Sequence, residues 1–153
     1  MSIGRTESEA IGLAIIMTCH NRRDITLSCL RALFTCSLPE DFCIQIYLVD
    51  DGSSDGTSDA VATEFSDVTI IYGDGDLFWN GGMRLSFSVA REKGYYYYLL
   101  LNDVTTLYPD AIISLLSCDS DYLQKTGRHA LIVGSTTNSS KSKTTYGGLV
   151  RAS

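Results

Sequence analysis

Basic residues are scarce in this chain of 153 residues, which has 12 Lys and Arg against 18 Asp and Glu and a net charge of -6. Nonspecific nucleic-acid binding needs a basic surface that neutralises phosphates, so we expect no nucleic-acid partner. Long apolar runs are also lacking, because the longest covers only residues 95–101 and the polar N-terminus has no signal-peptide core. We therefore expect a cytoplasmic protein, either free or peripheral to the inner face of the membrane.

Cysteine spacings typical of metal sites or disulfide frameworks are absent as well. The five cysteines are odd in number and include no CxxC pair. Hydrophobic residues make up 44% of the chain and charged residues 20%, which predicts one soluble domain with a substantial core. We expect residues 1–10 to form a flexible leader and residues 11–153 to form that domain.

Apolar runs of strand length alternate with segments of helical spacing. The predicted strands are Leu13–Met17, Ile44–Val49, Val68–Tyr72, Tyr95–Leu101 and Ala130–Val133. Helices are predicted over residues 25–34, 83–90 and 109–116, and loops over residues 79–82 and 136–145. Strands that alternate with helices run parallel, because their crossovers are right-handed. The sequence thus predicts an α/β fold of three layers, with a mostly parallel central sheet between helices.

The most informative stretch is the segment Leu48–Thr57, in which an apolar strand ends in two carboxylates followed by two glycines. The carboxyl ends of parallel strands border a crevice where such residues reach a ligand. Gly52 and Gly56 permit turns that a Cβ would forbid, and the hydroxyls of Ser53, Ser54 and Thr57 are suited to capping the next helix. An ordinary surface turn is the alternative interpretation.

Five motifs then occur in an order that is more specific than any one of them. They are Ile15–Arg22, Val49–Thr57, Trp79–Met83, Leu100–Asp103 and Tyr146–Gly148. In this order they resemble family 2 glycosyltransferases of the GT-A fold, and the chain is most similar to the rhamnosyltransferase-like branch. The resemblance covers nearly all residues from Leu13 onward.

The resemblance implies transfer of a sugar, with inversion, from a nucleoside diphosphate donor to a hydroxyl acceptor in cell-surface polysaccharide synthesis. By the same resemblance, Thr18 and Asn21 border the donor and His20 flanks the base. Asp51 accepts the N3–H of uracil or thymine, which implies a UDP- or dTDP-sugar because cytosine has no proton there. The full set of implied nucleotide-binding residues is Thr18, His20, Asn21, Arg22, Asp50, Asp51, Gly81, Gly82 and Asp103.

Structural alternatives exist for several of these residues. His20 fits a partly buried imidazole bonded to the backbone, and Asp50 fits a helix cap or a structural hydrogen bond. Trp79, with Asn80 and Arg84, is assigned to the sugar and diphosphate, since an exposed indole packs against a sugar face. A lone Trp is also a common core anchor, and a solvated helix face explains Arg84 equally well.

The sequence departs from the family's pattern at the metal site. The DxD-like element corresponds to Asn102-Asp103-Val104, and Val104 stands where the main metal-binding carboxylate is expected. Asp103 alone could still recruit Mg²⁺ or Mn²⁺, with reduced affinity. Either Arg22, Arg23 or Arg84 supplies the missing positive charge, or the donor binds weakly and turnover is lost.

A second departure concerns the catalytic base, which in an inverting transferase takes the proton of the acceptor hydroxyl. No Asp or Glu follows Asp121. His129 lies just before a predicted strand, and this position favours a structural role for it. We therefore expect the catalytic base beyond Ser153, and the catalytic residue is unknown. We interpret the chain as the donor-binding half of the enzyme, without the part that binds a saccharide or lipid-linked saccharide acceptor. We expect it to bind nucleotide and to transfer sugar poorly.

Two other classes remain open. A noncatalytic nucleotide-sugar-binding or assembly module would share the donor pocket and associate with another chain, including a second copy, through exposed apolar surface. A phosphorelay receiver domain has similar size and acidic strand ends, but its acidic pair follows the first strand, which here ends in Thr18-Cys19-His20-Asn21.

Overall fold

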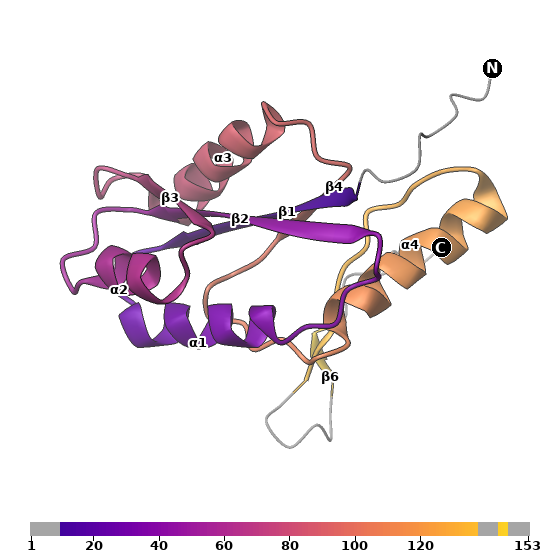
Figure 1. The fold of residues 1–153 in the computed structure, drawn as a ribbon, viewed down its shortest axis with the longest axis horizontal. Coiled ribbons are helices and arrows are strands. Elements are labelled where there is room, and N and C mark those ends of the chain that lie inside the picture. The colour runs from indigo at the N-terminus through magenta and orange to yellow at the C-terminus, as the bar shows by residue number, and fades with distance from the viewer. Residues whose placement is uncertain (1–9, 138–143, 147–153) are drawn as a thin grey trace.

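The computed structural model describes residues 10–137 and 144–146, which contain a parallel sheet of four strands in the order β3-β2-β1-β4. The strands are β1 (Ile11–Cys19), β2 (Phe42–Asp50), β3 (Val68–Tyr72) and β4 (Tyr97–Leu100). The helices are α1 (Arg23–Phe34), α2 (Thr57–Glu64), α3 (Phe78–Arg91) and α4 (Ala111–Thr126). A small antiparallel pair consists of β5 (Thr136–Thr137) and β6 (Thr144–Tyr146). Figure 1 shows the sheet from its β3 edge, with α3 above it and α1 and α2 below.

Successive side chains of β1 point to opposite faces of the sheet and so build two cores. On one face, Leu13, Ile15 and Met17 pack in a buried cluster with residues of α1, α2 and α4. On the other face, Ala14 and Ile16 pack with residues of α3. The sheet is therefore buried on both sides, and the predicted three-layer α/β architecture is confirmed.

The register brings the polar strand ends to one edge. Cys19 at the end of β1 is paired with Asp50 at the end of β2, and Asp50 is paired with Tyr72 at the end of β3. On the other side of β1, the N–H of Leu101 donates to the carbonyl of Ile16 at 3.0 Å. The loops that follow the strands consequently start side by side.

The prediction of a strand over residues 130–133 is wrong. The N–H of Ala130 donates to the Asp119 carboxylate at 3.0 Å instead of joining a ladder, and Leu131 is 93% exposed. The predicted strand Tyr95–Leu101 shortens to β4, whereas the first two predicted strands are longer than expected. Apolar composition alone could not show that the run 130–133 lacks a strand partner.

The loop predicted over residues 79–82 is also wrong, because these residues form the first turns of α3. The helix predicted over 109–116 begins slightly later, at Ala111, and extends to Thr126, where Gly127 ends it with a φ of 70°. The loop predicted over 136–145 contains β5 and part of β6. The predicted leader, apart from residue 10, and the glycines of Tyr146–Gly148 lie outside the described residues.

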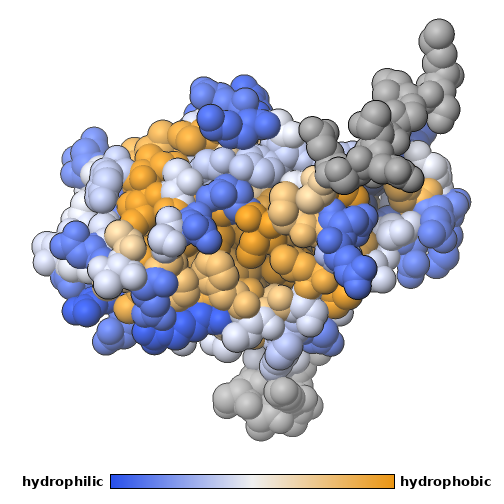
Figure 2. Space-filling model, viewed as in Figure 1, coloured by the Kyte–Doolittle hydropathy of each residue, from blue (hydrophilic) through white to orange (hydrophobic). Residues whose placement is uncertain are grey.

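Hydrophobic residues gather in a band across the middle of the face seen in Figure 1, as Figure 2 shows. Near the end of α1 and the start of β2, a hollow of about 300 Å³ is lined mainly by apolar residues, among them Leu33, Leu38 and Ile44. No helix within the described ranges is long and apolar enough to cross a membrane.

Candidate functional site

The loop after β1 is tied directly to the loop after β2. The backbone N–H of Asn21 donates to the Ser53 hydroxyl at 2.8 Å, and the N–H of Ser54 donates to the Asn21 side-chain oxygen at 2.7 Å. Asn21 has a φ of 50°, a left-handed conformation that Asn adopts more readily than most residues. These bonds make the two loops one surface, so the predicted convergence of the first two strand ends is confirmed.

His20 is exposed on this surface and is held by its neighbours. Its Nδ1 bonds the carbonyl oxygen of Asp51, and its Nε2 lies 3.0 Å from the side-chain nitrogen of Asn21. A carbonyl only accepts, so Nδ1 carries the proton and Nε2 accepts from the amide. The alternative of a backbone-bonded imidazole is therefore realised, although the ring lies at the rim rather than in the core. Its contact with a base stays a prediction.

Asp51 is 3% exposed and organises the loop between β3 and α3. One carboxylate oxygen accepts the N–H of Gly75 at 2.9 Å and that of Leu77 at 3.3 Å. The other accepts the N–H of Phe78, the first residue of α3, at 2.9 Å. The carboxylate thus satisfies backbone donors at and before the start of the helix, a task that local side chains perform at many other helices.

Phe78 is a functional candidate that the sequence patterns did not single out. Its φ is 52°, an uncommon conformation for a bulky residue, and such strain is concentrated at functional sites. Phe78 and its neighbour Trp79 are both exposed, Trp79 to 55%, so the tryptophan is not a core anchor. The contact between Asp51 and the Phe78 N–H holds this aromatic pair at the start of α3.

Gly82 has a packing reason to be glycine. A Cβ at this position would lie 2.1 Å from the hydroxyl oxygen of Thr18, so only glycine lets α3 approach β1 this closely. Thr18 is itself buried. The predicted approach of Gly81 and Gly82 to a pyrophosphate is not tested by these contacts and stays a prediction.

Asp50, the last residue of β2, makes local bonds. Asp50 accepts from the Ser53 N–H at 3.0 Å and from the Ser58 hydroxyl, which fits the structural alternative for this residue. The expectation that hydroxyls cap α2 is wrong, because its N-cap is Gly56 and no side chain caps the helix there. Asp55 instead accepts the N–H of Thr57 at 3.1 Å.

The loop after β4 joins the site through Asp103. One oxygen of this carboxylate lies 3.2 Å from Nη1 of Arg22, and the other accepts from the Thr26 hydroxyl at 3.3 Å. Asp103 is 1% exposed, whereas the Arg22 side chain is 50% exposed. Burial raises the pKa of Asp103 above its ordinary value of 3.8, although Arg22 and Thr26 act in the opposite direction.

An open hollow of about 380 Å³ lies where these loops meet the start of α1. It is lined by Asn21, Arg22, Arg23, Asp24, Ile25 and Asp55. The N–H of Arg23 donates to the Asp55 carboxylate at 3.0 Å, and the Thr57 hydroxyl, with that N–H, lowers the pKa of Asp55. Asp55 is therefore an ionised part of the α1–α2 junction.

The residues around Asp103 do not fit a divalent cation. Both oxygens of Asp103 already have partners, and the next residue, Val104, offers no oxygen from its side chain. Across the ranges that the structure describes, no group of three or more His, Cys, Asp or Glu is placed to hold a metal ion.

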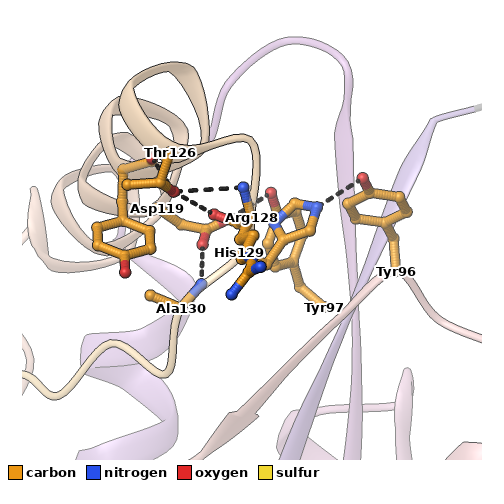
Figure 3. Close-up of polar contacts among 8 residues, drawn as sticks. Tyr96, Tyr97, Asp119, Thr126, Arg128, His129 and Ala130 are labelled. Atoms are coloured by element: carbon orange, nitrogen blue, oxygen red, sulfur yellow. Dashed lines mark hydrogen bonds and ion pairs between the residues drawn. The ribbon is translucent and has the colours of Figure 1, made fainter.

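The remaining candidate residues are Asn80, Arg84 and His129. Asn80 and Arg84 are exposed on α3. His129 lies near the amino end of β4, opposite the candidate site, where its Nδ1 contacts Asp119 at 2.7 Å and its Nε2 lies 3.1 Å from the Tyr96 hydroxyl (Figure 3). The expected structural role of His129 agrees with these contacts.

Comparison with known proteins gives a match to the sequence profile of Glycosyl transferase family 2 over residues 14–146. No curated protein matches the chain. Among solved structures, the chain is similar to the mannosyltransferase PcManGT from Pyrobaculum calidifontis, in complex with GDP-Man and Mn²⁺. The identity is 16% and the TM-score 0.59, over 71% of this chain and 32% of that chain. The chain spans about a third of that mannosyltransferase, and the likeness shows the fold.

Proposed function

The chain belongs to glycosyl transferase family 2, and we propose that it is the donor-binding part of an inverting enzyme that uses a UDP- or dTDP-sugar. One observation carries the proposal: the loops after all four strands of the sheet converge at one edge. Asn21 links the first two loops, Asp51 accepts from Gly75 in the loop after β3, and Arg22 contacts Asp103 in the loop after β4. Family membership favours this function over a receiver domain. A nucleotide at this edge would occupy the crevice typical of open α/β sheets.

The proposed contact with the nucleobase uses the remaining hydrogen-bond acceptor position of the Asp51 carboxylate. An ionised carboxylate offers about four lone-pair positions, and three backbone N–H groups occupy positions here. One acceptor position suffices for the N3–H of uracil or thymine. We propose that His20 lies against the base, that Thr18 and Asn21 border the donor, and that Gly81 and Gly82 lie near its pyrophosphate.

The sugar and diphosphate would meet the start of α3 and the end of β1. Trp79 is exposed there and suits the apolar face of a sugar. Asn80 and Arg84 provide polar groups on the same helix. The family implies a hydroxyl acceptor, and we propose a saccharide or lipid-linked saccharide of a cell-surface polysaccharide, with rhamnose-type transfer and a cytoplasmic location.

Calorimetric titration with UDP, dTDP, GDP and CDP tests the donor. We expect UDP and dTDP to bind at least about tenfold more tightly than GDP and CDP, a difference of about 1.4 kcal/mol. Tighter binding of GDP or CDP would overturn the role of Asp51.

A matched pair of histidine variants tests the location. We expect His20→Ala to weaken UDP binding several-fold, because His20 is exposed beside Asp51, whereas His129→Ala leaves it unchanged, because His129 lies at the other end of the sheet. Equal effects of the two variants would place the nucleotide elsewhere.

A noncatalytic binding module is the second candidate function, and the contacts of the carboxylates favour it. The buried acids of the site, Asp50, Asp51 and Asp103, all accept hydrogen bonds from the protein, which favours a positioning or binding role over that of a general base. We expect the 153-residue chain to bind nucleotide without transferring sugar at a useful rate. Robust transfer by the purified chain would refute this expectation.

A further inference from the structure

Arg22 lies where the loop after β1 meets the loop after β4, and it is the exposed member of a buried ion pair. Its Nη1 is 3.2 Å from Asp103, whose second oxygen accepts from Thr26. Asp103 is almost fully buried, whereas half of the Arg22 side chain is accessible. A ligand that reaches this point therefore meets the guanidinium and not the carboxylate.

We propose that Arg22, held in place by Asp103, takes the position of a divalent cation, so that this chain binds a nucleoside diphosphate without metal. The inference rests on the proposed function, because it assumes that a nucleotide occupies this edge. It goes further by naming the group that meets the diphosphate and by removing the metal requirement.

Charge balance supports the exchange. A divalent cation together with two carboxylates has a net charge of zero. A guanidinium together with one carboxylate also has a net charge of zero. Val104 removes one carboxylate from the DxD-like element, and Arg22 replaces two positive charges by one. The two changes compensate each other, so the diphosphate would meet a similar electrostatic environment.

The geometry of a guanidinium also suits the ligand. Arginine presents its N–H donors in a planar fork that binds phosphate oxygens in pairs. One donor atom of Arg22 contacts Asp103 and thereby orients the rest. Since the hollow beside Arg22 also contains Arg23, Asp24 and Asp55, its charges cancel. Recognition would therefore depend on the fork and not on net positive charge.

A metal ion would have to compete for Asp103. It would need to displace the Arg22 guanidinium and the Thr26 hydroxyl from a buried carboxylate, and Val104 would supply no further side-chain oxygen. Mg²⁺ and similar hard cations depend on carboxylate oxygens, so this competition disfavours the metal.

The test is calorimetric titration of UDP into the full 153-residue chain, in EDTA and again in excess Mn²⁺. We expect the wild type to bind with the same Kd in both buffers, within about twofold. Arg22→Gln should weaken binding in EDTA by at least about tenfold, a loss typical of a charged hydrogen bond. Arg22→Lys should also weaken it, because lysine keeps the charge but lacks the fork.

Arg91→Gln is the matched control, because Arg91 is exposed in the last turn of α3 and the variant changes the net charge equally. We expect it to bind UDP as the wild type does. The double variant Arg22→Gln/Val104→Asp restores a second carboxylate, and we expect it to bind UDP only when Mn²⁺ is present. Circular dichroism of each variant confirms that it is folded.

The outcomes separate this inference from the proposed function. Wild-type binding that requires Mn²⁺ overturns the inference and leaves the proposed function intact. Unchanged binding by folded Arg22→Gln, or a double variant that does not bind UDP in Mn²⁺, also argues against the exchange. No binding of UDP or dTDP in either buffer overturns both.

Discussion

Two buried carboxylates at opposite ends of the sheet have different surroundings. Asp119 accepts from the His129 ring at 2.7 Å, the Tyr97 hydroxyl at 3.0 Å and the Ala130 N–H at 3.0 Å (Figure 3). Asp103, in the candidate site, has only the longer contacts with Arg22 and Thr26. The three bonds of Asp119 hold this carboxylate firmly within the fold, whereas the two longer contacts hold Asp103 less firmly.

The pKa values follow the same contrast. Burial by itself would raise the pKa of Asp119, but the Ala130 N–H, His129 and Tyr97 lower it below its ordinary value of 3.8. Burial dominates at Asp103 and raises the pKa of that carboxyl. The fold thus stabilises the ionised form of Asp119 and disfavours that of Asp103.

Removing the better-bonded carboxylate should have the largest effect. Asp119→Ala leaves the Tyr97 hydroxyl and the Ala130 N–H without their acceptor, and we expect a loss of about 3 kcal/mol in the free energy of unfolding. Urea denaturation measures it. Asp121→Ala, an exposed position on the same helix, is the control and should change stability little.

Packing at the candidate site should come next. Gly82→Ala places a Cβ against the Thr18 hydroxyl, and we expect a loss of about 2 kcal/mol from overpacking. Gly81→Ala is the comparison on the same helix: its Cβ would lie 3.1 Å from the Leu77 Cβ, a milder contact than the 2.1 Å at Gly82, and alanine favours a helix. If both variants unfold at the same urea concentration, the close contact between α3 and β1 is not what requires glycine.

Lowering the pH should change the contributions of the two carboxylates to the free energy of unfolding in opposite directions. Because the pKa of Asp119 is lower in the folded chain, its ionised form stabilises the fold above the unfolded pKa of about 4, and this stabilisation is lost as the pH falls through the folded pKa. The raised pKa of Asp103 has the opposite sign, so its destabilisation is relieved as the pH falls through that pKa.

Unfolding free energies of the wild type, Asp119→Asn and Asp103→Asn from pH 7 to about pH 3 check this sign. As the pH falls, the loss of stability of Asp119→Asn relative to the wild type should shrink. Any gain of stability of Asp103→Asn relative to the wild type should shrink as well. Parallel pH profiles for the two variants would contradict the contrast.

The smallest effect is expected from Asp103→Asn at neutral pH. The amide removes the penalty of a buried charge, keeps one oxygen acceptor and gives up one long hydrogen bond and the ion pair with Arg22, so we expect stability to change by less than about 0.5 kcal/mol. A loss comparable with that of Asp119→Ala would mean that Asp103 is a structural residue, and the comparison would fail.

Local patterns predicted much of this fold. The apolar runs of β1, β2 and β3, the helix α1 and part of α3 follow from spacing, because each strand or helix needs an apolar face of its own period. Local patterns failed at residues 130–133 and 79–82. There the outcome depends on distant groups, since Asp119 binds the Ala130 N–H and Asp51 binds the Phe78 N–H at the start of α3.

A parallel α/β sheet with acidic and small residues at one edge follows from the chain's local patterns, since strand periodicity and strand ends are local properties. The contacts of each carboxylate do not follow from those patterns, because they depend on how the chain folds. Arg22 and Asp103 are 81 residues apart in the chain and meet because β4 lies beside β1. The physical reason is that sheet order and register, and not sequence distance, set which loops share an edge and hence which charges are paired.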